Sequence, residues 1–326
     1  MTTTDHGVPT AAGSGPRLPG RMRQLSWRTW YGVLVRSVRN FVRDNCSDWA
    51  AALTYYGVLA LFPSAIVVVA LVGLVSDGER TVDMVLELAR QVGAGSVVAN
   101  EGFVGVVRKV VEQEDSAKVL LSFGLLGALW SASGFIGAFT RASNAIYGVP
   151  EGRPFWKLRP LQIGLAGISL VLLAVVATGL IVSGPVADGV GDLIGAGGLA
   201  RTVWSVGRWP VLALITMALL SLLFWIAPNV RQPRFRWLTP GGAVALAAWA
   251  VASFGFGLYV ANFGSYDATY GSLGAVIAFL VWLYLSNSAL MLGVQINAEL
   301  QRGRRMQAGE EAPEEPVLPP KAPVGS

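Results

Sequence analysis

The sequence predicts an all-α, polytopic membrane protein with six transmembrane helices. Of its 326 residues, 53% are apolar and only 14% are charged, and the mean hydropathy is positive, at +0.53. A soluble domain carries about 25% charged residues. Six apolar runs reach the length of about 20 residues that a helix needs to cross the hydrocarbon layer. They comprise residues 49–75, 119–140, 161–183, 209–227, 241–263 and 271–298.

Residues 1–21 come before any apolar or amphipathic segment. They are rich in Gly, Pro and Thr, as disordered chains are, and they lack the apolar core of a cleavable signal peptide. We therefore expect a disordered cytoplasmic tail, followed by a membrane domain over residues 22–302 whose first span acts as its own insertion signal.

An amphipathic segment, residues 22–44, precedes the first span. Apolar side chains recur there every three or four residues, and arginines occupy the opposite face. Such a helix suits the membrane surface, where aromatic side chains enter the headgroup region and arginines meet anionic lipid. We expect interfacial lipid contacts from Trp27, Arg28, Tyr31, Arg36, Arg39 and Arg43. The alternative is a solvated helix packed against cytoplasmic loops.

Lysine and arginine are unevenly distributed between the loops on the two sides of the membrane. All 25 lie outside the six spans, and 18 of them fall in residues 1–48, 141–160, 228–239 and 299–326. The positive-inside rule places these segments in the cytoplasm. We therefore expect a multi-pass inner (plasma) membrane protein with both termini cytoplasmic and with membrane lipids, anionic lipids included, as partners. Because this topology explains most of the basic excess, we expect no nucleic acid partner.

Charged residues stand only at the ends of the spans. With this topology Asp48, Arg141 and Glu299 all lie at the cytoplasmic level, close to Asn144. Charged groups near a bilayer tend to face a bundle interior or an aqueous cavity. We expect a polar cluster lining a cytoplasm-facing vestibule, in which Asp48 pairs with Arg141 and Glu299 competes for it. The alternative is that Asp48, with Ser47, only caps the first span.

The sixth span carries polar side chains along one face. They advance by three or four residues, so they share one side of the helix. They would either line a passage or form interhelical hydrogen bonds, which is the commoner use. The stripe comprises Tyr284, Asn287, Ser288, Met291, Gln295 and Glu299. In the first span, Pro63 removes a backbone hydrogen bond and predicts a kink.

Few side chains are available for catalysis or metal binding. The chain has one cysteine, Cys46, and one histidine, His6. An intramolecular disulfide is excluded, and zinc and Ser-His-Asp chemistry lack the necessary residues. We expect no metal, no cofactor and no enzyme activity. The Pro/Glu-rich residues 303–326 predict a second disordered cytoplasmic tail.

Three stretches together resemble the YihY/BrkB family of bacterial inner-membrane proteins. They are DWAAALTYYGVLALFP, LWSASGFIGAFTRASNAIYGVPEGRPFWKLR and YGSLGAVIAFLVWLYLSNSALMLGVQINAEL. The resemblance covers about residues 25–302 and implies six transmembrane helices with both ends inside. Gly134 departs from the family pattern, where we expect an arginine or another polar residue. The matching positions are Asp48, Tyr55, Tyr56, Pro63, Trp130, Ser131, Arg141, Asn144, Tyr147, Phe155, Trp156, Tyr270, Gly271, Trp282, Tyr284, Asn297 and Glu299.

The family has also carried a ribonuclease BN label, and BrkB is associated with serum resistance in a pathogen. Neither label names a transport substrate. We expect a transporter, channel or lipid-handling protein of the cell envelope that uses the vestibule. The alternative is a noncatalytic envelope scaffold whose polar groups serve packing and assembly. A ribonuclease is disfavoured because the boundary acids form no metal-binding pair and His6 lies in the tail.

Overall fold

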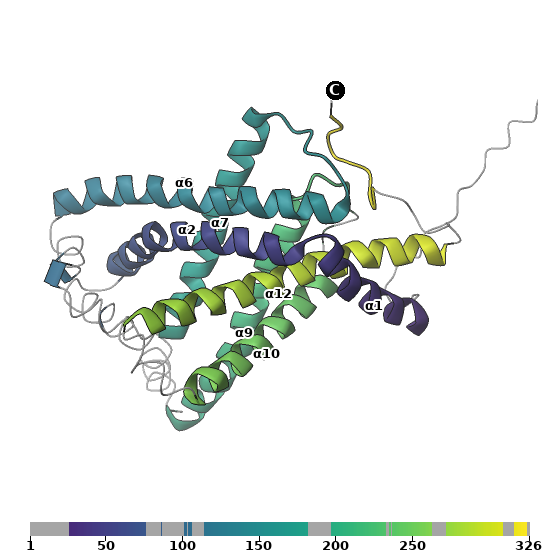
Figure 1. The fold of residues 1–326 in the computed structure, drawn as a ribbon. Coiled ribbons are helices and arrows are strands. Elements are labelled where there is room, and N and C mark those ends of the chain that lie inside the picture. The colour runs from purple at the N-terminus through teal and green to yellow at the C-terminus, as the bar shows by residue number, and fades with distance from the viewer. Residues whose placement is uncertain are drawn as a thin grey trace, which may run out of the picture.

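The computed structural model describes residues 26–75, 86, 101–102, 104–105, 114–181, 197–232, 235, 237–262, 272–308 and 316–324. These residues form seven long helices and no strand, which confirms the all-α class (Figure 1). The helices are α1 (Trp27–Arg43), α2 (Cys46–Val75), α6 (Glu114–Tyr147), α7 (Phe155–Ile181), α9 (Gly197–Ile226), α10 (Pro240–Asn262) and α12 (Ser272–Gln307).

Among the described residues, four helices are long and apolar enough to cross a membrane. They contain the segments Phe155–Val176, Val206–Ile226, Pro240–Ala261 and Val276–Gln307. In the α10 segment only 6% of the residues are buried, and large apolar side chains such as Phe254 and Val251 point outward. An outward apolar surface of this kind is stable only in lipid. α2 and α6 coincide with the predicted spans 49–75 and 119–140, while the count of six spans stays a prediction.

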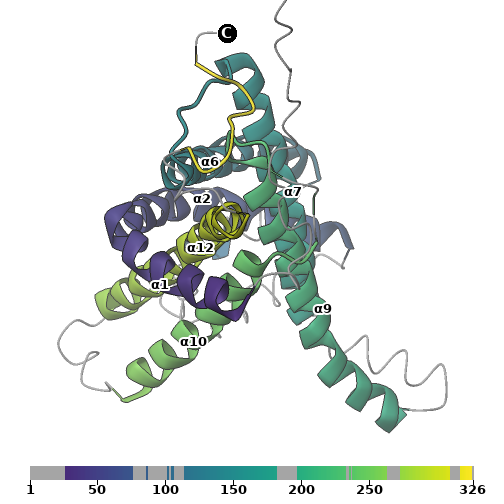
Figure 2. The same cartoon turned by 90° about the vertical axis from the view of Figure 1, so that its right-hand side faces the viewer.

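The central helix of the bundle is α12. It packs against α1, α2, α6 and α10, and Figure 2, which looks along its axis, shows it surrounded by them. α2 lies along α6, while α7 and α9 close the far side. This arrangement brings the start of α2, the ends of α6 and α9 and the last turns of α12 together, as hydrogen bonds between them show. We refer to this side of the molecule as the polar end.

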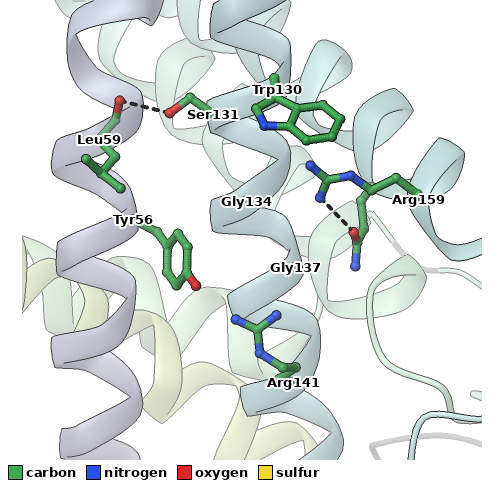
Figure 3. A pocket seen from close by; sticks show the side chains of 9 residues that line it. Tyr56, Leu59, Trp130, Ser131, Gly134, Gly137, Arg141 and Arg159 are labelled. Atoms are coloured by element: carbon green, nitrogen blue, oxygen red, sulfur yellow. Dashed lines mark hydrogen bonds between the residues drawn. The ribbon is translucent and has the colours of Figure 1, made fainter. Parts of the chain in front are cut away.

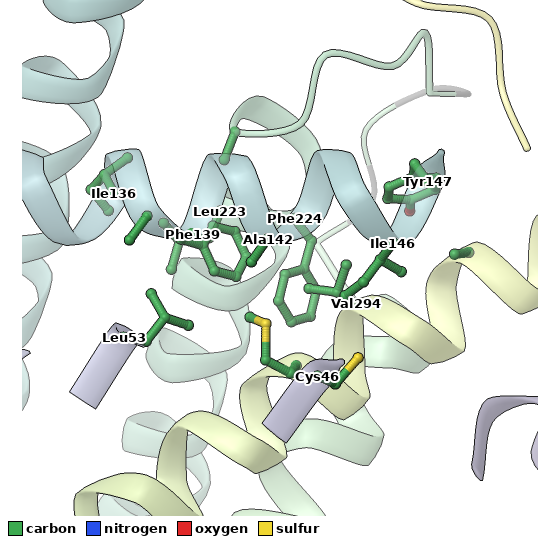
Figure 4. Close-up of a cluster of buried hydrophobic side chains, with 14 of the residues drawn as sticks. Cys46, Leu53, Ile136, Phe139, Ala142, Ile146, Tyr147, Leu223, Phe224 and Val294 are labelled. Carbon is green, nitrogen blue, oxygen red and sulfur yellow. The ribbon is translucent and has the colours of Figure 1, made fainter. Parts of the chain in front are cut away.

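The apolar core lies toward the polar end (Figure 4). The rings of Phe139 and Phe224 stack there with centroids 6.0 Å apart, and Leu53, Tyr147 and Val294 are almost fully buried around them. These side chains come from α2, α6, α9 and α12, and the same core includes Leu165 of α7 and Ala245 of α10, so it joins six of the described helices.

α10 and α12 approach each other through glycine. A Cβ atom at Gly241 would overlap the carbonyl oxygen of Gly293, and one at Gly293 would lie 2.7 Å from the carbonyl oxygen of Gly241. The backbone N–H of Gly241 also donates to Asn297 Oδ1 at 3.0 Å. Small residues that let backbones meet are typical of helix packing in membranes.

The predicted disordered C-terminal tail is wrong in two places. α12 continues to Gln307, nine residues beyond the predicted end of the span, and residues 316–324 fold back onto the polar end. Val317 is fully buried, and its N–H donates to the carbonyl of Tyr147 at 3.1 Å. The composition of the tail predicts no regular structure of its own. The prediction failed because backbone groups of Tyr147, Asn229 and Arg231 form hydrogen bonds with the tail and hold it in place. Residues 1–21 lie outside the described residues.

Candidate functional site

α1 has three distinct faces. Ser26 caps its N-terminus by accepting a hydrogen bond from Thr29 N at 3.1 Å. One face, with Val33, Ser37 and Asn40, is buried against the bundle. A second face exposes large apolar side chains: Trp27, Tyr31, Leu34, Val35, Val38 and Val42. The third carries Arg28, Arg39 and Arg43, which are also exposed. The helix itself and its amphipathic character are as predicted, whereas its contact with lipid stays a prediction.

Glu299 is the acidic centre of a buried cluster between α1 and α12. Its side chain is 1% exposed, and its carboxylate accepts hydrogen bonds from Arg36 Nε and Asn40 Nδ2, each at 2.8 Å. Arg302, one turn further along α12, also pairs with it. Arg36, predicted to contact lipid, therefore turns inward to neutralise Glu299, since a buried carboxylate needs a charged partner.

The expected pair between Asp48 and Arg141 is absent from the described residues. Asp48 is exposed in the first turn of α2, where a negative charge favours the positive end of the helix, and its N–H bonds to the Asn45 carbonyl at 3.1 Å. Arg141 instead lies over the ring of Tyr56, 5.8 Å from its centroid. Asp48, Arg141 and Glu299 thus occupy three separate surroundings: the surface, the ring of Tyr56 and the interior between α1 and α12.

Asn144 belongs to a fourth polar group, at the loop between α6 and α7. Its Nδ2 donates to Glu151 at 2.9 Å, and its Oδ1 accepts from Asn229 N at 2.7 Å. Glu151 is held by Arg153 through two hydrogen bonds of 2.7 and 2.8 Å. Burial alone would raise the pKa of Glu151, but the hydrogen bonds and charge of Arg153 and the Asn144 amide lower it below the ordinary value.

The polar stripe of α12 makes contacts between helices. Asn287 Nδ2 donates to Thr54 Oγ1 on α2 at 3.1 Å, and Gln295 Nε2 donates to Asp44 Oδ2 at 3.1 Å. Met291 is fully buried and Tyr284 packs against the core. Ser288 bonds to the carbonyl of Tyr284 in its own helix at 2.9 Å. The stripe therefore serves as a seam that joins α12 to α2 and to the turn between α1 and α2.

A pocket of about 450 Å³ opens between α2, α6 and α7 (Figure 3). Two glycines of α6 line it: Tyr56 lies 3.4 Å from where a Cβ of Gly134 would stand, and Gln162 and Arg141 lie 3.5 and 3.6 Å from that of Gly137. Ser131 Oγ ties α6 to the Leu59 carbonyl of α2 at 2.8 Å. The lining residues are Tyr56, Leu59, Trp130, Ser131, Gly134, Gly137, Arg141, Arg159 and Gln162.

The pocket has a cationic part and an apolar part. The guanidinium of Arg159 stacks 4.2 Å from the centroid of Trp130 and donates to Gln162 Oε1 at 3.4 Å. Neither Arg159 nor Arg141 pairs with a carboxylate among the described residues. Leu59 and Trp130, 48% and 63% exposed, form the apolar part on the outside of the bundle. Apart from the Arg159 N–H that bonds to Gln162, the in-plane N–H groups of both arginines stay available to an anion.

Sequence reasoning selected Arg141 but missed Arg159, Tyr56 and Gln162 as its neighbours. Arg159 and Tyr56 stood within the stretches that resemble the family, yet no local spacing relates α2, α6 and α7 to one another. Pro63 lies within α2 and is half-buried, and its kink stays a prediction.

The described residues contain no group of three or more His, Cys, Asp or Glu side chains that could hold a metal ion. The clusters above instead join single carboxylates to arginines and amides. Their contacts are ion pairs and hydrogen bonds within the chain.

Comparison with known proteins identifies the family. A family model described as virulence factor BrkB matches residues 37–318. The chain is 34% identical over 258 residues to the putative ribonuclease-like protein YfkH of Bacillus subtilis, covering 79% of this chain and 90% of that protein. It is 31% identical over 306 residues to a UPF0761 membrane protein of Rhodospirillum centenum, covering 91% of this chain and 63% of the relative.

A UPF0761 membrane protein of Alkalilimnicola ehrlichii is 30% identical over 293 residues, covering 85% of this chain and 61% of the relative. The chain thus spans less than two thirds of the length of these two UPF0761 proteins. No solved structure matches. The match over most of its length confirms the resemblance seen in the sequence, and the chain belongs to the BrkB family of membrane proteins.

Proposed function

We propose that this protein is a lipid-handling membrane protein that holds the anionic headgroup of an amphiphile in the pocket between α2, α6 and α7. The observation that carries the proposal is the pair of arginines, Arg141 and Arg159, which share the pocket without a carboxylate partner among the described residues. Guanidinium groups bind phosphate through several parallel hydrogen bonds. A volume of about 450 Å³ is within the usual range of ligand sites.

The apolar part of the pocket favours a lipid over a free anion. Trp130 and Leu59 continue the pocket toward the outward, apolar surface of the bundle, so an acyl chain can follow them while the headgroup stays with the arginines. With both termini in the cytoplasm, as the distribution of basic residues predicts, the pocket would face the inner leaflet, which carries anionic lipids.

A channel or transporter along α12 has less support than this pocket. The polar side chains that would have lined such a passage, Asn287, Gln295 and Glu299, bond to α1, α2 and the turn between them. The same contacts favour a second candidate, a noncatalytic envelope scaffold. That candidate needs no ligand, so lipid binding separates the two.

The test is the binding of short-chain lipids to the purified full-length protein in a neutral detergent. Dihexanoyl phosphatidylglycerol is compared with dihexanoyl phosphatidylcholine, and glycerol 3-phosphate and inorganic phosphate serve as ligands without acyl chains. We expect saturable binding of phosphatidylglycerol above all others. Arg141→Gln and Arg159→Gln should each weaken it about 10–100-fold, because a charge-assisted hydrogen bond contributes about 1.5–3 kcal/mol.

Two further variants show whether the pocket itself is occupied. Gly137→Leu fills the pocket without changing the charge and should abolish binding. Lys157→Gln removes an exposed positive charge from the same turn of α7, outside the pocket, and should leave binding unchanged. Equal binding of the two phospholipids, or an equal effect of Lys157→Gln and Arg159→Gln, would refute the headgroup site and leave the scaffold as the better account.

A further inference from the structure

The C-terminal segment 316–324 lies along the loop after α9 at the polar end, beside the end of α6 (Figure 1), and we refer to the surface beneath it as the groove. Its backbone pairs with the loop after α9: Arg231 N–H donates to the Pro319 carbonyl at 2.8 Å, and Lys321 N–H donates to the Asn229 carbonyl at 3.0 Å. These bonds flank an antiparallel bridge between Val230 and Pro320. Main-chain pairing of this kind is how protein domains bind extended peptides.

Two side chains of the segment enter specific surroundings. Val317 is fully buried in the apolar core. Lys321 Nζ donates to three carbonyls at the end of α9, those of Trp225, Ile226 and Pro228, at 3.1, 3.2 and 3.0 Å. The last carbonyls of a helix lack partners within it and carry partial negative charge, so an ammonium group is well suited to them. The two side chains are four residues apart.

Several residues of the groove contact the backbone of the segment rather than its side chains. The side chain of Asn229 donates to the Ala322 carbonyl at 2.8 Å and accepts from Ala322 N–H at 3.0 Å, as a second peptide strand would. Gly152 lies directly beneath, where any Cβ would overlap the Ala322 carbonyl. Arg305 of α12 donates to the Val317 carbonyl at 3.0 Å.

We propose that this surface is a peptide-binding groove whose ligand is an extended, proline-rich segment with an apolar residue four positions before a lysine, and that residues 316–324 occupy it within the same chain. Four of the nine residues are proline, which holds the segment extended before it binds. Only Val317 of the segment is buried, so the other contacts of the segment lie near the surface, where a ligand from solution can replace them. This inference does not depend on the lipid site.

The experiment releases residues 316–324 from the groove by mutation and then measures whether a synthetic peptide binds in their place. In the full chain, Val317→Asp together with Lys321→Ala removes both anchors while the groove stays unchanged. A synthetic peptide of residues 314–324 should then bind this variant saturably. It should bind the wild-type chain at least tenfold more weakly, because the tethered segment competes at a high effective concentration. Adding Gly152→Ala to the vacated variant should abolish binding, and a peptide with Lys321→Ala should not bind.

A second measurement uses the wild-type protein alone. The amides of Val317, Lys321 and Ala322 donate hydrogen bonds, so they should exchange hydrogen at least tenfold more slowly than they do in the free peptide. Unprotected exchange of these amides would overturn the proposal, and so would equal peptide binding by the wild-type and vacated chains or no binding by a folded vacated chain. If the vacated chain does not fold, the exchange rates decide the matter.

Discussion

At the scale of single residues, two carboxylates near helix ends have opposite surroundings. Asp48 is exposed in the first turn of α2, whereas Glu299 is buried with Arg36, Asn40 and Arg302. The sequence analysis selected Asp48 because this residue stands at the start of an apolar run. The partners of Glu299 on α1 are some 260 residues away in the chain, so no local pattern marks them.

The charge of Glu299 should matter much more for stability than that of Asp48. Glu299→Gln leaves Arg36 and Arg302 without their anion, and breaking a buried ion pair costs about 3–5 kcal/mol. We expect a loss toward the lower end of this range because Arg36 is 21% exposed. Asp48→Asn should change the free energy of unfolding by less than about 0.5 kcal/mol. Unfolding of both variants in the same detergent measures the difference.

A double variant tests whether pairing is the cause. Glu299→Leu combined with Arg36→Met removes both charges, so the loss should be smaller than the sum of the two single losses. Strict additivity, or equal losses for Asp48→Asn and Glu299→Gln, would contradict the cluster.

The surroundings of Glu151 predict that the folded protein loses stability in acid. Its pKa is lowered in the folded protein from 4.5. Below pH 4.5 the unfolded chain therefore binds a proton that the folded one does not, and stability falls as the pH drops through the folded pKa. The melting temperature of wild type should fall below about pH 4.5 more steeply than that of Glu151→Gln. Parallel profiles for the two proteins would show that Arg153 and Asn144 do not stabilise the carboxylate.

At the scale of helices, hydropathy predicts where chains cross lipid better than it predicts where helices end. The predicted span 241–263 differs by one residue at each end from α10. α12 exceeds its span because Glu299–Gln307 continue the helical hydrogen bonds outside the apolar region. α9 likewise begins at Gly197, before the arginines that delimited its predicted span. The polar stripe of α12 stays a prediction, and the contacts of Asn287 with Thr54 and of Gln295 with Asp44 could be seen only with the neighbouring helices in place.

Two glycine-to-alanine variants test the close approach of α10 and α12, one at the contact and one away from it. Gly293→Ala places a methyl group against the Gly241 carbonyl, and overpacking typically costs about 1–3 kcal/mol. Gly255→Ala in α10 meets no atom within 4 Å and should be neutral or stabilise the helix by up to about 1 kcal/mol. Melting temperatures of the two variants test this, and similar values would mean that the helices do not meet through glycine.

At the scale of the whole molecule, the sequence predicted the class, the family and the membrane location. It did not predict how the helices assemble. The proposed lipid pocket needs Arg141 and Arg159 from two helices with an aromatic ring from a third, and the proposed peptide groove needs Val317 to reach Tyr147 from a segment with a disordered composition. Both depend on contacts between distant parts of the chain, which residue patterns do not encode.

The orientation of the molecule is tested by reporter fusions. Fusions at residues 150, 234 and 310 should report the cytoplasm, and fusions at 95, 195 and 267 the opposite side, because the basic residues concentrate in the first set of segments. A fusion at 150 that reports the outside would contradict the six-span topology.

The position of Glu299 also sets an order of assembly during synthesis. Arg36 leaves the ribosome 263 residues before its partner, which at about 5–20 residues per second is a delay of about 13–50 s. While the later helices are still being made, Arg36 therefore has no Glu299 to neutralise it, and α1 has no α12 to pack against. Its docking, and with it the closure of the bundle around α12, can occur only as the last span is completed. Translation therefore sets the earliest time at which α1 can dock, and the contacts of residues 316–324 form later still.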